Sequence, residues 1–347
     1  MKKTEKKLPF GSDYMRGAHP AVLDRLVETN MLPTAGYGMD EISESARERI
    51  RTACACEQAQ IEFLMGGTQA NATVIDAFLK SYQGVVAAET GHINTHEAGA
   101  IEAHGHKVLA LPHHLGKLRP EEVQAYLRDF HDDANHEHMV MPGMLYLSHP
   151  TEYGTLYTRA ELMEFRRICD EYHINLYVDG ARLAYALASP ENDVTLPDLA
   201  ACCDAFYIGG TKCGALFGEA VVIPDPEKLP GFYTMIKQHG ALLAKGRMLG
   251  IQFDELFRDN LYLHIGKPAI GAAERITHIL KEKGYRLFFE SPTNQIFCIL
   301  ENDQLTALGQ AVEYSFWEKY DENHTVIRLA TDWATTQREI EDLIAVL

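Results

Sequence analysis

The sequence contains no run of about 20 apolar residues, which is the length that a membrane-spanning helix needs. It begins with MKKTEKKLPFGSDY, which is basic but leads directly into turn residues, without the apolar stretch of a secretory signal peptide. Basic residues are also scarce, because 32 lysines and arginines face 49 acidic residues, for a net charge of −17. Such a charge repels phosphate backbones and anionic membranes. We therefore expect a cytoplasmic protein that binds neither nucleic acids nor membranes.

The cysteines lack both the pattern of a disulfide framework and the C-x-x-C pair of a zinc site. Their number is odd, and we expect reduced thiols. The histidine-rich segment 134–143 and the pair His113-His114 have the composition of solvated loops, and no predicted helix gathers these side chains as ligands. We therefore predict no metal site. The seven cysteines are Cys54, Cys56, Cys169, Cys202, Cys203, Cys213 and Cys298.

The residues that are abundant predict an α/β fold. The composition is 46% hydrophobic and 23% charged, which is ordinary for a folded protein. Segments of helical period alternate with short apolar runs, and this alternation favours a mostly parallel sheet flanked by helices. The segment 158–173 predicts a helix that starts with a capping box of Thr158 and Glu161. The predicted buried strands are 85–89, 107–112, 143–150, 174–180, 204–210 and 219–224.

The pattern also changes along the chain. Residues 231–265 predict a long, mostly helical connection, and from about residue 266 short strands mix with helices, as in a separate α+β domain. We expect three parts: a loop-rich N-terminal segment over residues 1–42 that packs across both domains, a large domain over 43–250, and a smaller C-terminal α+β domain over 251–347.

One lysine stands in an otherwise apolar segment. Residues 204–219 read DAFYIGGTKCGALFGE, and Lys212 lies between an apolar, aromatic run and a run of small residues. A buried ammonium is unfavourable unless it is paired or has lost its charge. Two interpretations are open: the side chain extends along the surface to reach water, or it forms a Schiff base with a carbonyl cofactor.

An acidic residue ends a predicted strand upstream. In INLYVDGARLAYAL, Asp179 follows a hydrophobic run, so its carboxylate would project from the carboxyl edge of the sheet, where open α/β sheets bind ligands. Asp-Gly is also an ordinary turn sequence. Arg182 follows within one helical turn, and the two side chains could pair with each other.

A glycine-rich turn opens a predicted helix in FLMGGTQANATVIDAFL (63–79). Free backbone N–H groups at such a helix start bind phosphate. The segment lacks the Gly-Lys-Ser/Thr of a Walker motif and the spacing of G-x-G-x-x-G. Beyond the next predicted strand lie His92 and Glu97, where the histidine could be a surface residue or a ring that stacks on a flat ligand.

Together these features match what pyridoxal phosphate requires: a lysine, an acid for the pyridine nitrogen, a helix start for the phosphate and a flat partner for the ring. Their order is compatible, with the glycine-rich turn first, then His92, then Asp179, and Lys212 33 residues later (212 − 179). The sequence therefore predicts pyridoxal 5'-phosphate as the cofactor.

The residues and order of the motifs resemble those of the low-specificity L-threonine aldolases, which belong to the β-eliminating lyase superfamily of fold-type I pyridoxal-phosphate enzymes. VDGAR with GGTK at this spacing is specific, whereas GGTQAN alone is not. The matching stretches span nearly the whole chain: FGSD (10–13), GYGMD (36–40), GGTQAN (66–71), ETGHINTHEAGA (89–100), PTEYGTLYT (150–158), VDGAR (178–182), GGTKCGALFGEA (209–220), KQHGALLAKGRM (237–248) and IRLATDW (327–333).

The resemblance implies a role for each matching residue. Lys212 would bind the cofactor aldehyde, Asp179 would pair with the pyridine nitrogen, and His92 would stack on the ring. Phosphate binding is implied for Gly67 and Thr68 through their amides and for the Thr211 hydroxyl. The substrate carboxylate would be held by Ser12, Arg182 and Arg328, since a guanidinium suits a carboxylate. Tyr37 and Lys245 match positions that reach the site of a neighbouring subunit, with Tyr37 toward the substrate and Lys245 toward the cofactor, in homotetramers built from dimers that share active sites. Glu152 is also implied to contact the substrate.

The implied activity is retro-aldol cleavage of L-threonine, L-allo-threonine or related β-hydroxy-α-amino acids to glycine and an aldehyde. The chain departs from many aldolases in one motif, because the run from His149 to Tyr153 stands where they carry Glu-Asn-Thr-His. This leaves open whether His92, Glu152 or a bound water takes the proton of the substrate hydroxyl. The alternatives are another fold-type I enzyme, a β-eliminating lyase or aminotransferase, and a non-catalytic ligand-binding homologue.

Overall fold

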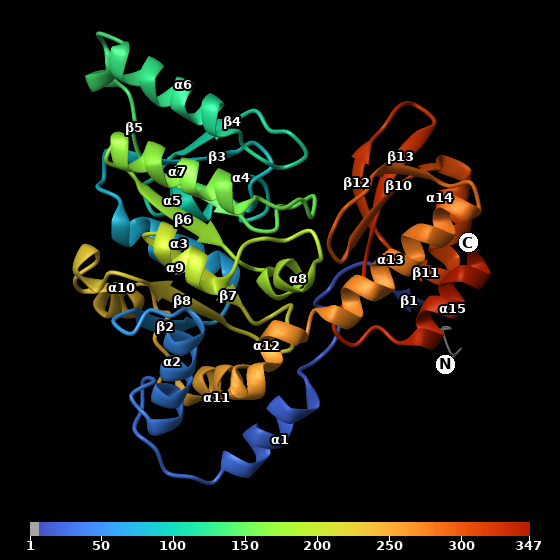
Figure 1. Ribbon diagram of the computed structural model, residues 1–347, viewed down its shortest axis with the longest axis horizontal. Helices are drawn as coiled ribbons and strands as arrows, with labels where there is room; N and C mark the ends of the chain where they lie inside the picture. Colours follow the sequence, from blue (N-terminus) through green and yellow to red (C-terminus); the bar gives the residue numbers. More distant parts are fainter. Residues whose placement is uncertain (1–6) are drawn as a thin grey trace.

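The computed structural model describes residues 7–347, so the first six residues of the predicted N-terminal segment lie outside the described residues. Figure 1 shows a large α/β domain, on the left, beside a smaller domain that contains the C-terminus. This arrangement confirms the predicted fold class, with a mostly parallel central sheet and a smaller α+β domain.

The large domain is built on a seven-stranded sheet. The strand order is β2-β8-β7-β6-β5-β3-β4, and all neighbours are parallel except β8, which is antiparallel to β2 and β7. All six predicted strands are confirmed, but β2 was missed, because this edge strand alternates half-buried polar residues with apolar ones. The strands are β2 (Gln60–Leu64), β3 (Gln83–Ala88), β4 (Val108–Leu111), β5 (Met141–Ser148), β6 (Asn175–Asp179), β7 (Ala205–Gly209) and β8 (Glu219–Ile223).

Two helical layers cover this sheet, and alternate strand residues face each layer, as the two-residue period of a strand requires. One layer contains α2 (Glu41–Ala53), α6 (Pro120–Asp132), α7 (Arg159–Glu171), α8 (Leu183–Ala188) and α9 (Leu196–Cys202). The other layer contains α3 (Gly67–Phe78), α4 (His92–Thr95), α5 (Ala100–Ala103) and α10 (Phe232–Gln238). Short 3₁₀ turns are η1 (His136–His138) and η2 (Pro226–Lys228).

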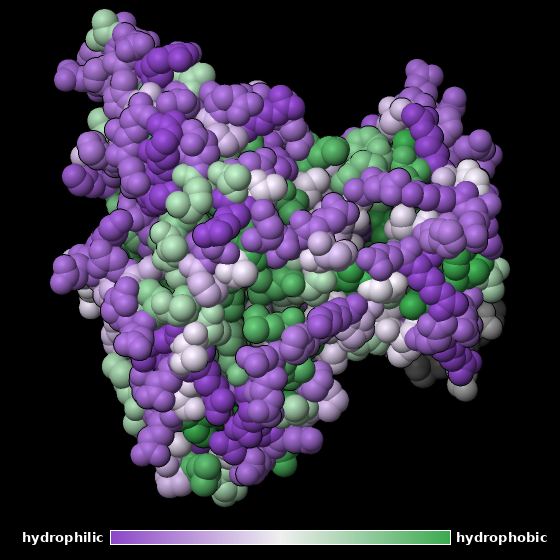
Figure 2. All heavy atoms as spheres, in the orientation of Figure 1, coloured by the Kyte–Doolittle hydropathy of each residue, from purple (hydrophilic) through white to green (hydrophobic). Residues whose placement is uncertain are grey.

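The predicted helix at 158–173 is confirmed as α7. Thr158 and Glu161 form the expected capping box. Leu162, Phe165 and Ile168 are buried against the sheet. Figure 2 shows that the outer surface over α6 and α7 is mostly hydrophilic, as expected for helices that bury one face.

A helical connection follows, as predicted for 231–265. After α10 come α11 (Arg247–Leu256), η3 (Arg258–Asn260), α12 (Leu261–His264) and α13 (Lys267–Glu282). Phe253 and Tyr262 pack in the core of the large domain. The start of α13, at Ala269 and Ile270, belongs to this core, whereas Ile276 and Leu280 belong to the core of the small domain. The division at residue 250 stays a prediction.

The small domain contains an antiparallel sheet in the order β12-β13-β10-β9. Its strands are β9 (Arg286–Phe289), β10 (Gln295–Glu301), β12 (Ser315–Lys319) and β13 (His324–Ala330), with helices α14 (Asn302–Ala311) and α15 (Gln337–Val346). The N-terminal segment contacts both domains: β1 (Leu8–Pro9) pairs with β11 (Val312–Glu313) of the small domain, and α1 (Pro20–Thr29) packs on α11.

Within residues 7–347, no helix is long and apolar enough to cross a membrane. The same residues hold no group of three or more histidine, cysteine or acidic side chains arranged to bind a metal ion. All seven cysteines are free and buried.

Phe165 tests the packing of α7 on the sheet. Its side chain is fully buried, so Phe165→Ala should lower the free energy of unfolding by about 3–5 kcal/mol. Met163→Ala on the exposed side of the same helix should change it by less than about 0.5 kcal/mol. Urea denaturation followed by circular dichroism measures both changes, and equal losses in the two variants would contradict this packing.

Candidate active site

The predicted site residues converge at the carboxyl ends of β3, β5, β6 and β7, which meet at one edge of the sheet. Two adjoining cavities open there. An inner cavity of about 270 Å³ is lined by Gly67, Thr68, His92, Glu152, Asp179, Arg182, Thr211 and Lys212. An outer cavity of about 540 Å³ shares His92, Glu152, Arg182 and Lys212, and adds Arg328 from the small domain.

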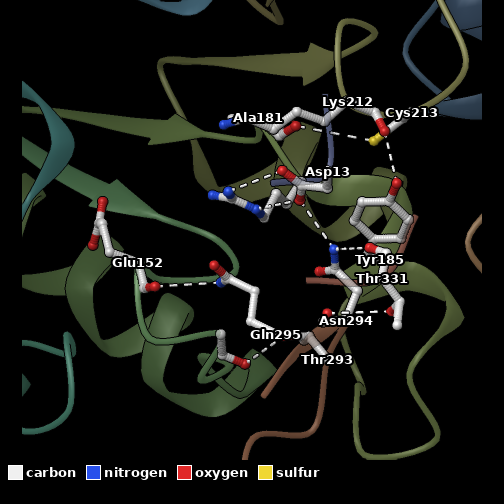
Figure 3. Close-up of polar contacts among 12 residues, drawn as sticks. Asp13, Glu152, Ala181, Tyr185, Lys212, Cys213, Thr293, Asn294, Gln295 and Thr331 are labelled. Atoms are coloured by element: carbon white, nitrogen blue, oxygen red, sulfur yellow. Dashed lines mark hydrogen bonds and ion pairs between the residues drawn. The ribbon is translucent and has the colours of Figure 1, made fainter. Parts of the chain in front are cut away.

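Lys212 lies in a tight turn between β7 and β8. The turn is closed by a hydrogen bond from the Gly210 amide to the Gly218 carbonyl at 2.9 Å. A Cβ atom at Gly209 would come within 2.4 Å of the Ala181 carbonyl oxygen, so only glycine permits this close approach. Figure 3 shows the Lys212 backbone carbonyl held by the Tyr185 hydroxyl, at 2.6 Å. The backbone is therefore fixed while the side chain lines both cavities.

The charge state of Lys212 follows from these surroundings. Removal from water, followed by the positive charge of Arg182, lowers the pKa of Lys212, although nearby carboxylates act in the opposite direction. A lysine with a lowered pKa is a competent nucleophile toward an aldehyde. Of the two interpretations of Lys212, the geometry supports the second, because the side chain faces a cavity between the two domains.

Asp179 ends β6 and is held as an ionised carboxylate. Its Oδ2 atom accepts hydrogen bonds from the Tyr146 hydroxyl at 2.6 Å and the Asn71 amide at 3.1 Å. Its Oδ1 atom accepts one from the Ala181 backbone amide at 2.9 Å. Burial alone would raise the pKa of Asp179, but the charge of His92 and the hydrogen bond from Tyr146 outweigh burial and lower it. Such a carboxylate is suited to hold a protonated ring nitrogen.

The start of α3 provides an anion site. Its N-cap is Gly66, which has no side chain to cap the first amides, and the first turn carries no acidic residue. Gly67 and Thr68 line the inner cavity at this point. The Thr211 hydroxyl, which also lines the cavity, donates to Glu219 at 2.8 Å and accepts from the Gly218 amide at 3.0 Å. The free amides fit a phosphate at the start of α3, and the Thr211 hydroxyl could donate to it by turning away from Glu219.

His92 opens α4 and is fixed by a carboxylate. Its Nδ1 atom lies 2.7 Å from Glu97 Oε1, which also accepts a hydrogen bond from Asn71 Nδ2 at 2.7 Å. Asn71 thereby links the partner of His92 to Asp179. The imidazole orientation is set from behind by this buried network, so that the ring lines the inner cavity.

Arg182 does not pair with Asp179. Its Nε and Nη2 atoms donate to the two oxygens of Asp13 at 2.6 and 3.1 Å. Asn294 of the small domain also donates to Asp13, at 3.0 Å. Figure 3 shows Asp13 between Asn294 and the base of the Lys212 turn. Although burial would raise the pKa of Asp13, Arg182 and then Lys212 hold it well below its ordinary value.

Arg328 faces the outer cavity from β13. It donates to Gln295 at 3.0 Å and to Ser315 at 3.1 Å, and its guanidinium lies over the Trp317 ring, 5.6 Å from the centroid. Burial, followed by the charge of Arg182, lowers the pKa of Arg328 to about 10, so the group stays charged at neutral pH. Two guanidinium groups from different domains therefore line one cavity, which is a suitable arrangement for a carboxylate.

The sequence profile of the family described as "Beta-eliminating lyase" matches residues 10–335 of this chain. The chain belongs to the beta-eliminating lyase family. Its resemblance to the threonine aldolases is confirmed: the low-specificity L-threonine aldolase of Pseudomonas aeruginosa is 28% identical over 347 residues, covering 98% of this chain and 97% of the relative.

Solved structures agree with this family assignment. The threonine aldolase of Leishmania major has a TM-score of 0.94 and 41% identity, covering 97% of this chain and 98% of that one. The aspartate aminotransferase of Thermus thermophilus, at 12% identity, 98% and 90% coverage and a TM-score of 0.72, shares the fold alone. The predicted fold-type I architecture is therefore confirmed.

Three of the predicted site residues of this member of the beta-eliminating lyase family line neither cavity. Ser12 is buried next to Asp13, and its hydroxyl has no hydrogen-bond partner among the described residues. Tyr37 and Lys245 are exposed, on two segments that touch through a hydrogen bond from the Tyr37 amide to the Ala244 carbonyl at 3.1 Å. Their proposed roles stay predictions.

Sequence reasoning missed Asn71, Asp13 and Glu219 as parts of the site. All three lie inside stretches that carried the resemblance, GGTQAN, FGSD and GGTKCGALFGEA, so the signal was present. Glu219 begins β8 and accepts hydrogen bonds from the Gly210 amide and Thr211. Burial raises the pKa of Glu219 to about 8. His149 of the departing motif is fully buried outside both cavities, and burial lowers the pKa of His149 to about 4.

Asp13 tests the role of the buried ion pair. Asp13→Asn leaves the mostly buried Arg182 guanidinium without its counter-charge, so the free energy of unfolding should fall by about 3–5 kcal/mol. Asp129→Asn, which breaks the exposed pair with Arg128, should change it by less than about 1 kcal/mol. Urea denaturation of both variants at neutral pH makes the comparison, and a small loss in Asp13→Asn would show that the pair is not needed.

Proposed function

We propose that the protein is a pyridoxal-phosphate-dependent aldehyde-lyase that cleaves L-threonine, L-allo-threonine and related β-hydroxy-α-amino acids to glycine and an aldehyde. The observation that carries this proposal is the convergence of Lys212, Asp179 and the start of α3 on one cavity that opens into a second one containing Arg182 and Arg328. The threonine aldolases of Pseudomonas and Leishmania, similar over nearly the whole chain, support this reaction rather than elimination or transamination.

The residues present fit the cofactor. The amides of Gly67 and Thr68 would bind its phosphate, aided by Thr211, and Asp179 would hold the proton on its ring nitrogen. Lys212 would hold its aldehyde carbon, and the His92 ring would lie against its ring. When bound, pyridoxal phosphate supplies an acceptor for the electron pair of a bond broken at the substrate α carbon.

The remaining residues bind and orient the amino acid. Arg328 and the free Nη1 of Arg182 would hold the substrate carboxylate, with Ser12 nearby, and this contact sets which bond at the α carbon is aligned for cleavage. Glu152 lines both cavities near the position of the β-hydroxyl group. The protein thus contributes orientation, charge and a route for the hydroxyl proton.

We also infer a homo-oligomer, a dimer of dimers in which Tyr37 and Lys245 reach the site of a second copy. The segment that precedes α2 exposes several large apolar side chains, which supports coverage by another chain: Val27 (77% exposed), Met31 (87%) and Met39 (63%). We place the protein in the cytoplasm. The buried free thiols and the net charge of −17 support this location.

Aldehyde release tests the proposed function. With added pyridoxal phosphate and L-threonine, the protein should release glycine and acetaldehyde in equal amounts, measured with a coupled alcohol dehydrogenase. Lys212→Ala should lose turnover by about 10²–10⁴-fold or more and lose the absorption band of the lysine-bound cofactor. Lys107→Ala, at an exposed lysine that precedes β4 and lies outside both cavities, is the matched control and should keep both.

Two outcomes separate the alternatives. If the absorption band is present but no aldehyde forms from any β-hydroxy-α-amino acid, the assignment of the cofactor site is supported and the proposed reaction is wrong. Pyruvate release from serine would then indicate elimination, and dependence on a keto acid would indicate transamination. Turnover that persists in Lys212→Ala would overturn the site assignment itself.

A further inference from the structure

The reaction proposed above requires a group that takes the proton of the substrate β-hydroxyl, and this inference rests on that proposal. Such a group must stand where the cofactor cavity meets the substrate cavity. The residues that line both cavities are Tyr14, His92, Glu152, Arg182 and Lys212.

Most of these residues have another role or are unsuited to take the proton of the substrate hydroxyl. Arg182 keeps its proton at neutral pH and is bound to Asp13. Lys212 is reserved for the cofactor, and Tyr14 is 58% exposed. The ring of His92 is held by Glu97 through Nδ1 and is assigned above to the face of the cofactor ring. Among the described residues, Glu152 is the carboxyl group common to both cavities.

Glu152 is held in place by three contacts. Its Oε1 atom accepts hydrogen bonds from the Ser148 hydroxyl at 2.6 Å and the His92 backbone amide at 3.0 Å. Its backbone carbonyl accepts one from Gln295 at 3.3 Å. Figure 3 shows the carboxyl group of Glu152 pointing away from Gln295. The small domain therefore fixes the backbone and leaves the carboxyl group to the cavities.

A line of hydroxyl groups joins Glu152 to Asp179. Ser148 Oγ lies 2.6 Å from Glu152 Oε1 and 3.1 Å from the Tyr146 hydroxyl oxygen. The Tyr146 hydroxyl in turn donates to Asp179 Oδ2 at 2.6 Å. Tyr146 and Ser148 alternate along β5 and face the same side of the sheet, so the strand itself sets this spacing.

The hydrogen bonds that this line of hydroxyl groups can form depend on whether Glu152 is protonated. A serine hydroxyl has one hydrogen, so when Ser148 donates to an ionised Glu152, it cannot also donate to Tyr146. When Glu152 is protonated, it donates to Ser148, Ser148 donates to Tyr146, and Tyr146 donates to Asp179. Every hydrogen bond of the line is then formed, which requires a single proton on Glu152 and a charged Asp179.

We propose that Glu152 is the acid–base group of the cleavage, and that Ser148 and Tyr146 couple its protonation to the charge of Asp179. In the cleavage direction, the β-hydroxyl O–H bond breaks and the proton forms an O–H bond on Glu152. The hydroxyl carbon becomes a carbonyl, and the electron pair of the Cα–Cβ bond leaves with the α carbon. The α carbon then takes one proton from water to give glycine, and Glu152 releases its proton to water. The reaction therefore consumes no net proton, and Glu152 returns to its starting state.

The electrostatic surroundings agree with this role. Burial raises the pKa of Glu152, the hydrogen bond from Ser148 lowers it, and the charge of Asp179 raises it again. Burial raises the pKa of Tyr146 well above its ordinary value, so Tyr146 relays a hydrogen bond without ionising. Several charged and titratable groups of the large domain and the N-terminal segment line the cavities with Glu152 or act on it: Tyr14, His92, Tyr146, Tyr153, Tyr157, Asp179, Arg182 and Lys212. The small domain contributes Arg328 and Glu318 to the outer cavity and the neutral Gln295 to the Glu152 backbone.

Two substitutions should move the titration of Glu152 in opposite directions. Ser148→Ala removes the donor to the ionised carboxylate, so the pKa of Glu152 should rise by about half to one unit. Tyr146→Phe removes the acceptor that Ser148 uses when Glu152 is protonated, so the pKa of Glu152 should fall. The infrared carboxyl stretch of the cofactor-free protein, assigned by its absence in Glu152→Gln, reports both shifts. Tyr126→Phe on α6, outside both cavities, should cause none.

The holoenzyme gives an independent readout. The acidic limb of the plot of kcat/KM against pH should move to higher pH in Ser148→Ala and to lower pH in Tyr146→Phe. In Glu152→Gln the limb should disappear while the cofactor absorption is retained. An acidic limb that persists in Glu152→Gln would overturn the proposal. So would Ser148→Ala and Tyr146→Phe variants whose limbs move in the same direction or do not move. If the wild-type protein released no aldehyde, the proposed function would fail on its own, and the infrared titration would still decide whether Glu152 and Asp179 are coupled.

Discussion

The buried ion pair between Asp13 and Arg182 is the interaction on which the site depends. Asp13 comes from the N-terminal segment, Arg182 follows β6 of the large domain, and Asn294 reaches the same carboxylate from the small domain. Three parts of the chain, separated by 169 and 281 positions, thus meet at one fully buried charge. Breaking such a pair leaves a charge in a poorly solvated place, so the three parts are held together near the cavities.

The same pair also makes the two guanidinium groups of the site different from each other. Arg182 has two of its five N–H donors bound to Asp13, and its Nη1 atom has no partner among the described residues and can face a ligand. Arg328 is held by the neutral oxygens of Gln295 and Ser315, and burial, followed by the charge of Arg182, lowers its pKa to about 10 despite the opposing effect of Asp13. An incoming carboxylate would therefore gain more from Arg328, while Arg182 supplies a fixed direction.

The sequence predicted the sheet well because its strands are buried on both faces and read as apolar runs. It failed at β2, where an edge strand mixes Gln60 and Glu62 with apolar residues. Residues at strand ends, such as Asp179 and Lys212, were found because a parallel sheet gathers its carboxyl ends at one edge. The partner of Arg182 could not be found this way, since local spacing favours Asp179 and Asp13 lies 169 positions away. Likewise, the line from Glu152 to Asp179 depends on tyrosine and serine side chains that look like ordinary strand residues.

The helix α13 has one end in each hydrophobic core, with Ile270 in the core of the large domain and Ile276 in that of the small domain. A hinge usually requires a segment that can change its backbone angles without exposing apolar surface. Ile270 and Ile276 are both buried, so a rotation of one domain that separated either of them from its core would expose apolar surface to water. The helix therefore ties the two cores to each other beside the cavity that Arg182 and Arg328 line.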